Sequence, residues 1–187
     1  MSDSKKINEI ADMAESYFRK GYNCSQSVFV PFAYRYGIDE KTALKMSASF
    51  GGGMGRMREV CGCMSAMALV AGFESGCTTD YNPKGKEKNY EMVQHLAEEF
   101  KKVSGGSIVC RELLGLDKKM KTQNEPTKQA ADNRSENMTS PIPSERTQEY
   151  YKKRPCIQLI RAACEILESQ IGGEKYEQST DDGIDNS

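Results

Sequence analysis

Apolar side chains recur every three or four residues along most of the chain, and nowhere do they alternate with polar ones in the period-two pattern of a β-strand. This spacing places the apolar side chains on one face of a helix. The three clearest stripes are Ile7, Ile10, Ala11, Ala14, Tyr17 and Phe18; Tyr90, Val93, Leu96, Ala97, Phe100 and Val103; and Ile157, Ile160, Cys164, Leu167 and Ile171. The sequence therefore predicts an all-α fold, a compact bundle of six or seven helices with a long polar loop before the last helix.

Side chains that cap helices mark where several of these helices begin. Asn23, followed by Gln26 three residues later, is a variant of the capping box, and Asp39 can cap the next helix. Ser107 is expected to cap a short helix, and Pro155 suits the first position of the last one.

Two segments lack any apolar period. Residues from Asp117 to about Glu149 are mainly Lys, Gln, Asn, Glu, Thr and Pro, and so long a span without secondary structure is uncommon in a compact domain. We interpret this loop, 117–149, as either a functional cover or a disordered segment. The tail, 172–187, is polar and acidic and is expected to fray. The chain is thus predicted to form a single helical domain over residues 1–171, followed by a disordered tail.

The charges of the 187 residues are almost balanced, with 26 Lys and Arg against 27 Asp and Glu and a formal net charge of -1. Such a balance gives no general attraction to nucleic acid or to an anionic membrane. The longest apolar run, 60–73, is too short to span a bilayer, and the first residues lack the apolar region of a secretory signal. We therefore expect a cytoplasmic protein with no nucleic-acid partner and no membrane insertion.

Seven cysteines in a chain expected to be cytoplasmic indicate metal binding or redox chemistry rather than structural disulfides. Four of them fall near predicted helix starts: Cys24, Cys61, Cys110 and Cys156. The unpaired N–H groups and the dipole at a helix start lower the pKa of a thiol and favour the thiolate, which is both the nucleophile and the metal ligand. Arginines close in sequence can add positive potential, namely Arg56, Arg58, Arg111 and Arg154. These four cysteines are therefore the candidate redox-active thiols and the candidate metal ligands.

The remaining three cysteines differ from these four. Cys164 lies on the apolar stripe of the last helix and is expected in the core. Cys77 lies in a polar loop and is expected to be a surface thiol. Cys63 is two residues beyond Cys61, so on a regular helix it points to a different face. It could still join the same site if that turn is irregular.

The glycine-rich run FGGGMGRM, residues 50–57, precedes a helix that is expected from about Val60 to Gly72. The run lacks the Lys-Ser/Thr ending of a phosphate loop and follows a helix rather than a strand, which argues against a nucleotide site. Glycine permits tight turns and a close approach of the backbone. We expect Gly52, Gly53 and Gly55 to bring the backbone close to a sulfur site and to contact any cofactor bound there.

Histidine and methionine are weaker candidates than cysteine for a functional site. His95 lies between glutamates on a polar helix face, and we expect a solvated side chain rather than a catalytic base or a ligand. No CxxCH motif occurs, so covalent c-type haem is excluded. Five methionines could bind a soft metal but are expected instead to fill gaps in a helical core: Met46, Met54, Met57, Met64 and Met67.

The order of the segments NCSQ, FGGGMGR…CG…G, CRELLG and RPC resembles the C-GCAxxG-C-C family of redox-active proteins. The resemblance runs from about Cys24 to the last helix and implies the same four functional cysteines. The central motif departs from the family pattern, because reading it from Cys63 places Met64 at the alanine position and Met67 at the final glycine position. We therefore prefer Cys61 as the central functional cysteine and keep Cys63 as the second choice.

Two chemistries fit such a set of thiols. The cysteines could hold an iron–sulfur cluster or another thiophilic metal for electron transfer, or pairs of them could cycle between dithiol and disulfide. The protein would then be an oxidoreductase or an electron carrier that acts on a redox partner the sequence does not identify. The alternative is a non-catalytic helical interaction module with structurally buried cysteines, in which the loop 117–149 meets a partner.

Overall fold

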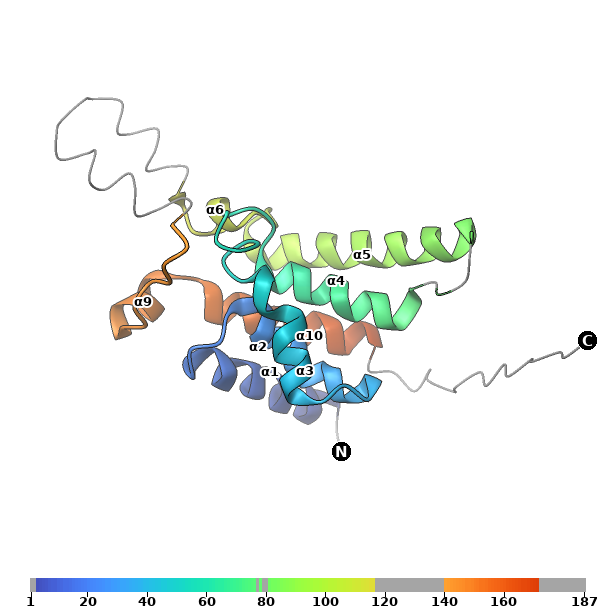
Figure 1. Ribbon diagram of the computed structural model, residues 1–187, viewed down its shortest axis with the longest axis horizontal. Coiled ribbons are helices and arrows are strands. Elements are labelled where there is room, and N and C mark those ends of the chain that lie inside the picture. The colour runs from blue at the N-terminus through green and yellow to red at the C-terminus, as the bar shows by residue number, and fades with distance from the viewer. Residues whose placement is uncertain (1–2, 77, 79–80, 117–139, 172–187) are drawn as a thin grey trace, which may run out of the picture.

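The computed structural model describes residues 3–76, 78, 81–116 and 140–171 (Figure 1). This part of the chain contains eight α-helices, two short 3-10 helices and no strand, which confirms the all-α prediction. The helices are α1 (Asp3–Arg19), α2 (Cys24–Ala33), α3 (Glu40–Ser47), α4 (Gly62–Ser75), α5 (Pro83–Ser104), α6 (Cys110–Leu113), α9 (Gln148–Lys153) and α10 (Cys156–Ile171), with η1 (Tyr34–Tyr36) after α2 and η2 (Ala48–Phe50) after α3.

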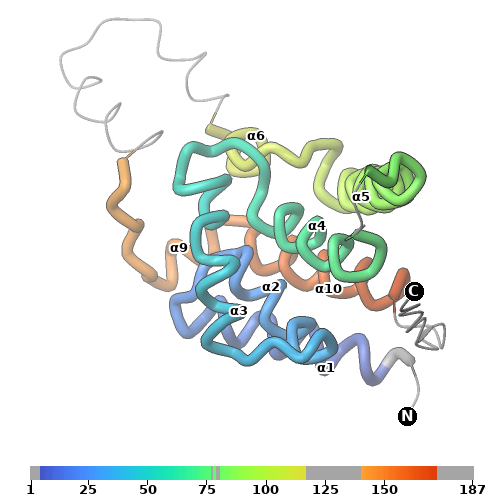
Figure 2. Tube along the Cα trace, turned by 45° about the vertical axis from the view of Figure 1, so that its right-hand side comes forward, coloured from blue at the N-terminus to red at the C-terminus, as the bar shows by residue number. Residues whose placement is uncertain are grey.

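The long helices pack around one core. α1 lies against α10 and α2, α2 against α4, and α4 against α5 (Figures 1 and 2). The largest side chains that are fully buried between them are Phe18, Phe29, Phe32, Phe100, Met67, Leu96, Ile160 and Leu167. The apolar stripes predicted for α1, α5 and α10 therefore meet in this core, except that Tyr90 and Val103 of the α5 stripe are exposed.

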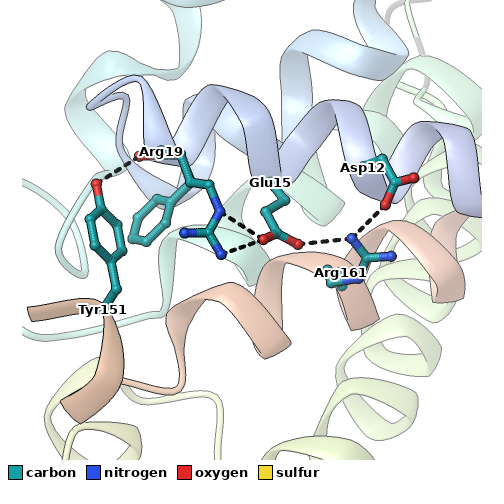
Figure 3. Close-up of polar contacts among 6 residues, drawn as sticks. Asp12, Glu15, Arg19, Tyr151 and Arg161 are labelled. Carbon is teal, nitrogen blue, oxygen red and sulfur yellow. Dashed lines mark hydrogen bonds and ion pairs between the residues drawn. The ribbon is translucent and has the colours of Figure 1, made fainter. Parts of the chain in front are cut away.

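Polar contacts join α1 to α9 and α10 (Figure 3). The guanidinium of Arg161 on α10 lies between Asp12 and Glu15 of α1, at 2.7 Å and 2.9 Å from their carboxylate oxygens. Arg19 also binds Glu15, and this hydrogen bond is the main reason that the pKa of the Glu15 carboxyl is lowered. The Tyr151 hydroxyl on α9 donates to the backbone carbonyl of Phe18 at 3.5 Å. α9 and α10 are thus both attached to α1.

Two of the predicted caps are confirmed. The side chain of Asn23 accepts from the backbone N–H of Gln26, and the Gln26 side chain accepts from the backbone N–H of Asn23, so the capping box is complete. Asp39 caps α3 by accepting from the backbone N–H of Thr42. These local interactions start the two helices where the sequence predicts them.

Three other boundaries differ from the prediction. Val109, not Ser107, is the N-cap of α6, although the Ser107 hydroxyl accepts from the Val109 N–H at 2.9 Å. α10 begins at Cys156, and Pro155 precedes it and supplies the carbonyl that accepts the N–H of Leu159. α4 begins at Gly62 rather than about Val60.

The sequence also did not predict α9, which falls at the end of the loop expected over 117–149 and beyond it. Residues 117–139, the tail 172–187 and Cys77 lie outside the described residues, so those expectations stay predictions. None of the helices in the described ranges combines the length and the apolar character needed to cross a membrane.

Two of the five methionines that were expected to fill gaps in the core do lie in it. Met64 and Met67 are buried in the core, whereas Met46, Met54 and Met57 are 40–50% exposed. The three exposed methionines lie at the end of α3 and in the glycine-rich loop, where the chain leaves the core. His95 is exposed, as predicted, and Cys164 is fully buried in α10, as predicted.

Candidate functional site

Four helices begin at the same end of the bundle, and each begins at a cysteine. Cys24, Cys110 and Cys156 are the first residues of α2, α6 and α10, and Cys61 is the N-cap of α4. Figures 1 and 2 show the glycine-rich loop before α4, together with α6 and α9, at this end. The four candidate cysteines, which are far apart in the sequence, therefore converge.

The thiols at this end lie close enough to shift one another's ionisation. The pKa of Cys24 responds to hydrogen bonding from Cys156 and Cys63, and the pKa of Cys63 responds to Cys24 and Cys61. Cys110 lies near enough to Cys24 and Cys61 for their charges to affect its ionisation. We call these five residues the cysteine cluster. Cys63, the second choice from sequence, is thus a neighbour of both Cys24 and Cys61.

The glycine-rich loop passes directly over this cluster. A Cβ added at Gly53, whose φ is +72°, would lie 2.6 Å from the Cβ of Cys110. A Cβ added at Gly62 would lie 3.2 Å from the Cβ of Cys24. Two Cβ atoms essentially never lie 2.6 Å apart. Because Gly53 has no side chain, the loop backbone can cover the Cys110 side chain. Gly52 and Gly55 also have positive φ angles and belong to the same loop.

A small piece of backbone pairing holds Cys61 and Cys110 in fixed relative positions. Val60 and Val109 form an isolated antiparallel bridge. The N–H of Cys61 donates to the carbonyl of Ile108 at 2.8 Å, and the N–H of Cys110 donates to the carbonyl of Glu59 at 2.6 Å. These bonds satisfy backbone groups that a helix start otherwise leaves unpaired.

The cluster favours ionisation of one thiol. The pKa of the Cys24 thiol is lowered well below its ordinary value, because the thiols of Cys156 and Cys63 donate hydrogen bonds to it and Arg146 adds its charge. The pKa values of Cys63 and Cys156 are raised, because each thiol donates a hydrogen bond to Cys24 and so keeps its proton. Burial raises the pKa of Cys110 to about 11, with help from the neighbouring thiols. Cys24 is therefore the member that becomes a thiolate first.

Cys24 is also the accessible member. Among the six cysteines of the described residues, all unpaired, it is the only one that is not buried. It opens on a pocket of about 280 Å³ whose wall also includes Cys110 and Cys156. A half-buried thiol on a pocket wall with a lowered pKa is the arrangement of a reactive cysteine rather than of a structural one.

The rest of the pocket wall is strongly basic. Arg56 and Arg58 come from the glycine-rich loop, Arg146 from the segment before α9, and Arg154 from the link between α9 and α10. Tyr150 of α9 also lines the pocket, and the guanidinium carbons of Arg146 and Arg154 lie 4.7 Å and 4.5 Å from its ring centroid.

Sequence reasoning named Arg56, Arg58 and Arg154 but missed Arg146 and Tyr150. Neither of the missed residues lies near a candidate cysteine in sequence, and no apolar period marks their segment, so no signal pointed to them. Arg111, also named, is instead ion-paired with Glu59 at 2.8 Å.

The cluster does not form a ready-made metal centre. Within the described ranges, no three His, Cys, Asp or Glu side chains are placed so that they could bind one ion together. Thiolates are nevertheless the donor type that iron–sulfur clusters and zinc require.

The spacing of these cysteines is the signature of a known family. The model of the family described as "Putative redox-active protein (C_GCAxxG_C_C)" matches residues 22–170. The chain belongs to this family. The match begins just before α2 and ends in α10, so it includes every member of the cysteine cluster.

The C_GCAxxG_C_C family membership supports redox activity as the general role of the cluster. If the central motif of the family is read from Cys63, Gly62 and Cys63 supply its Gly-Cys and Met64 replaces its alanine; the preferred reading from Cys61 stays a prediction. No curated protein and no solved structure matches the chain.

Proposed function

We propose that the protein is a cytoplasmic thiol–disulfide redox protein in which Cys24 attacks and Cys156 completes the exchange. The observation that carries this proposal is the position of Cys24, the least buried of the described cysteines, on the same pocket wall as Cys156, whose thiol lowers the pKa of Cys24. A reducing compartment such as the cytoplasm keeps thiols free, which suits a protein with unpaired cysteines.

The exchange follows from this geometry in two displacements. The Cys24 thiolate attacks one sulfur of an external disulfide, forms a mixed disulfide with it, and the other external sulfur leaves as a thiolate. Cys156 then loses its proton and attacks the Cys24 sulfur, which forms the Cys24–Cys156 disulfide and releases the second external thiolate. The external disulfide gains two electrons, and the two cysteine thiols lose them.

Cys156 rather than Cys63 is the proposed second thiol. Both contact Cys24, but Cys156 lines the pocket and Cys63 is fully buried and does not. Cys63 serves as a hydrogen-bond donor that stabilises the thiolate, and Cys61 supports Cys63.

A disulfide needs only two sulfurs at bonding distance, whereas an iron–sulfur cluster needs several thiolates around one centre. The pairwise contacts of the cysteine cluster support the first chemistry. A cluster and an inert interaction module are therefore the two outcomes that the test must distinguish from exchange.

The test combines metal analysis with disulfide mapping. The protein is purified anaerobically, its iron, sulfide and zinc content is measured per chain, and it is then treated with bis(2-hydroxyethyl) disulfide and digested for mass spectrometry. We expect metal-free protein and a reversible Cys24–Cys156 linkage that Cys24→Ser abolishes. Cys164→Ala, which changes a buried thiol outside the cluster, is the matched control and retains the linkage.

Two results would contradict the proposal. Stoichiometric iron and sulfide that disappear in Cys24→Ser would support the iron–sulfur cluster. Thiols that stay reduced under conditions that oxidise free cysteine, in protein without metal, would support the interaction module.

A further inference from the structure

Among the residues that the structure describes, the four arginines of the pocket have no acidic partners. No Asp or Glu lines the pocket, and within the described residues no salt bridge joins Arg56, Arg58, Arg146 or Arg154 to a carboxylate. The whole chain has a formal net charge of -1, so this concentration of positive charge is local. Basic side chains gathered in a concave site without counter-charges attract anions.

Two of these side chains have buried nitrogen atoms that lack any hydrogen-bond partner. Arg58 is 4% exposed, and its Nε has no hydrogen-bond partner. Nη1 of Arg146 is buried and unpartnered in the same way. Buried guanidinium nitrogens are almost always paired, so each of these is a donor that a bound group could satisfy.

The hydrogen bonds that the arginines do make leave their charges uncompensated. Arg56 donates to the carbonyl of Ser140 at 2.8 Å and to the hydroxyl of Ser144 at 3.3 Å, and Arg146 donates to the carbonyl of Tyr22 at 3.2 Å. All three acceptors are neutral. Burial, together with the charges of Arg58 and Arg154, lowers the pKa of Arg56, which shows that the guanidinium groups repel one another.

Aromatic rings hold two of these arginines in place. Arg146 lies over the ring of Phe18, 4.4 Å from its centroid, and both Arg146 and Arg154 lie over Tyr150. Cation–π contacts of this kind orient a guanidinium without neutralising it. The pocket therefore has the properties of a preformed anion site.

We propose that this pocket is the substrate subsite of the protein and that it selects small disulfides that carry anionic groups such as carboxylates. This inference rests on the proposed thiol–disulfide function. The anionic group pairs with the guanidinium groups, and Cys24 on the same wall attacks the substrate sulfur. A volume of about 280 Å³ admits a molecule with two short arms. The covalent step is the exchange described above, with the anionic disulfide as the oxidant.

Three disulfides with two-carbon arms provide the test, because they differ mainly in charge. They are 3,3′-dithiodipropionate, which is anionic; bis(2-hydroxyethyl) disulfide, which is neutral; and cystamine, which is cationic. We would measure the second-order rate constant for loss of the Cys24 thiol with each. We expect the anionic compound to react about tenfold faster than the neutral one, with cystamine slowest, and this preference to fall as ionic strength rises.

The arginine variants connect this preference to the pocket. Arg58→Gln should reduce the ratio of anionic to neutral rate constants several-fold, and Arg56→Gln provides a second pocket variant if Arg58→Gln does not fold. Arg19→Gln removes the same charge from an arginine on α1 that does not line this pocket, and it should leave the ratio unchanged. Because the ratio is taken within each variant, a change in the ionisation of Cys24 cancels.

The outcomes separate the two levels of the proposal. If Cys24 reacts with all three disulfides without an anionic preference, or with a preference that the pocket variants retain, the subsite is wrong and the exchange function stands. If Cys24 reacts with none of them, the exchange function is wrong and the subsite is overturned with it.

Discussion

Cys24 and Cys156, the first residues of α2 and α10, line the same pocket at one end of the bundle, and the Cys156 thiol is the main cause of the lowered pKa of Cys24. Both helices belong to the core, so the two sulfurs are positioned by the packing of the whole domain rather than by a local motif. A disulfide between them would link the start of the second long helix to the start of the last one.

The first prediction concerns the pH dependence of Cys24 alkylation by iodoacetamide, followed by mass spectrometry of the Cys24 peptide. Because the pKa of Cys24 is lowered, its thiolate persists as the pH falls below about 8.5, the ordinary value for free cysteine. The rate should fall only when the pH drops through the lowered pKa. Cys110, whose pKa is raised to about 11, should remain largely unlabelled over the same range. A midpoint for Cys24 at or above the ordinary value would contradict the prediction.

The second prediction separates the hydrogen bond from Cys156 from its sulfur chemistry. Cys156→Ser keeps a donor beside Cys24, whereas Cys156→Ala removes it. Since the Cys156 thiol is the main cause of the lowered Cys24 pKa, the alkylation midpoint should move to higher pH in Cys156→Ala than in Cys156→Ser. Neither variant should form the linkage of the wild-type protein. Equal midpoints in the two variants would show that the hydrogen bond has no such role.

The third prediction concerns the glycine-rich loop. In Gly53→Ala the new Cβ would meet the Cys110 Cβ at 2.6 Å and the backbone nitrogen of Glu59 at 2.8 Å, at a φ of +72°. We expect a loss of about 2–4 kcal/mol in the free energy of unfolding, measured with urea. Gly55→Ala is the matched control, because its φ is +56° but nothing lies within 4 Å of the added atom. It should lose only about 1 kcal/mol, the cost of the left-handed conformation alone. Similar losses in the two variants would mean that the close approach to Cys110 is not limiting.

The fourth prediction tests whether the capping box positions Cys24. Asn23→Ala removes the acceptor for the Gln26 N–H and also the hydrogen bond to the Ala48 carbonyl at 2.8 Å. It should cost about 1–2 kcal/mol of stability and slow the alkylation of Cys24. Asp39→Ala removes the equivalent cap from α3 and should cost about 1 kcal/mol without affecting that rate. An unchanged alkylation rate in folded Asn23→Ala would refute the link.

The fifth prediction concerns a buried carboxylate remote from the cysteine cluster. Glu168 on α10 is 5% exposed, forms an ion pair with Arg35, and lies 3.0 Å from the ammonium of Lys6. Glu168→Gln leaves both cations without their counter-charge and should lower the free energy of unfolding by about 1–3 kcal/mol. Glu149→Gln, which disrupts an exposed pair with Lys153, should change it by less than about 1 kcal/mol. Comparable urea midpoints for the two variants would contradict this difference.

Local signals were enough to predict most of the fold. The three-to-four residue spacing of apolar side chains identified α1, α5 and α10, and the caps at Asn23 and Asp39 located two helix starts. α9 was missed because its six residues, QEYYKK, are too few to show a period. Its helical state depends on tyrosines that pack against Phe18 of α1, a contact that the sequence does not reveal.

The cysteine cluster was only partly predictable, for the same reason. That four cysteines lie at helix starts follows from local patterns, and the structure brings those starts together. That Cys63 rather than Cys61 contacts Cys24 depends on where α4 begins, which is set by pairing with residues 108–109. Arg146 reaches the pocket from a segment with no apolar period at all. Long-range pairing of this kind leaves no trace in residue spacing.

The bridge between Val60 and Val109 also limits which insertions and deletions the chain can accept. Neighbouring residues in a paired backbone point to opposite sides, so inserting or deleting one codon between the glycine-rich loop and α4 would turn Cys61 away from Cys110. We expect insertions and deletions to be tolerated at the far ends of α4 and α5, and to be rejected in these few positions beside the bridge.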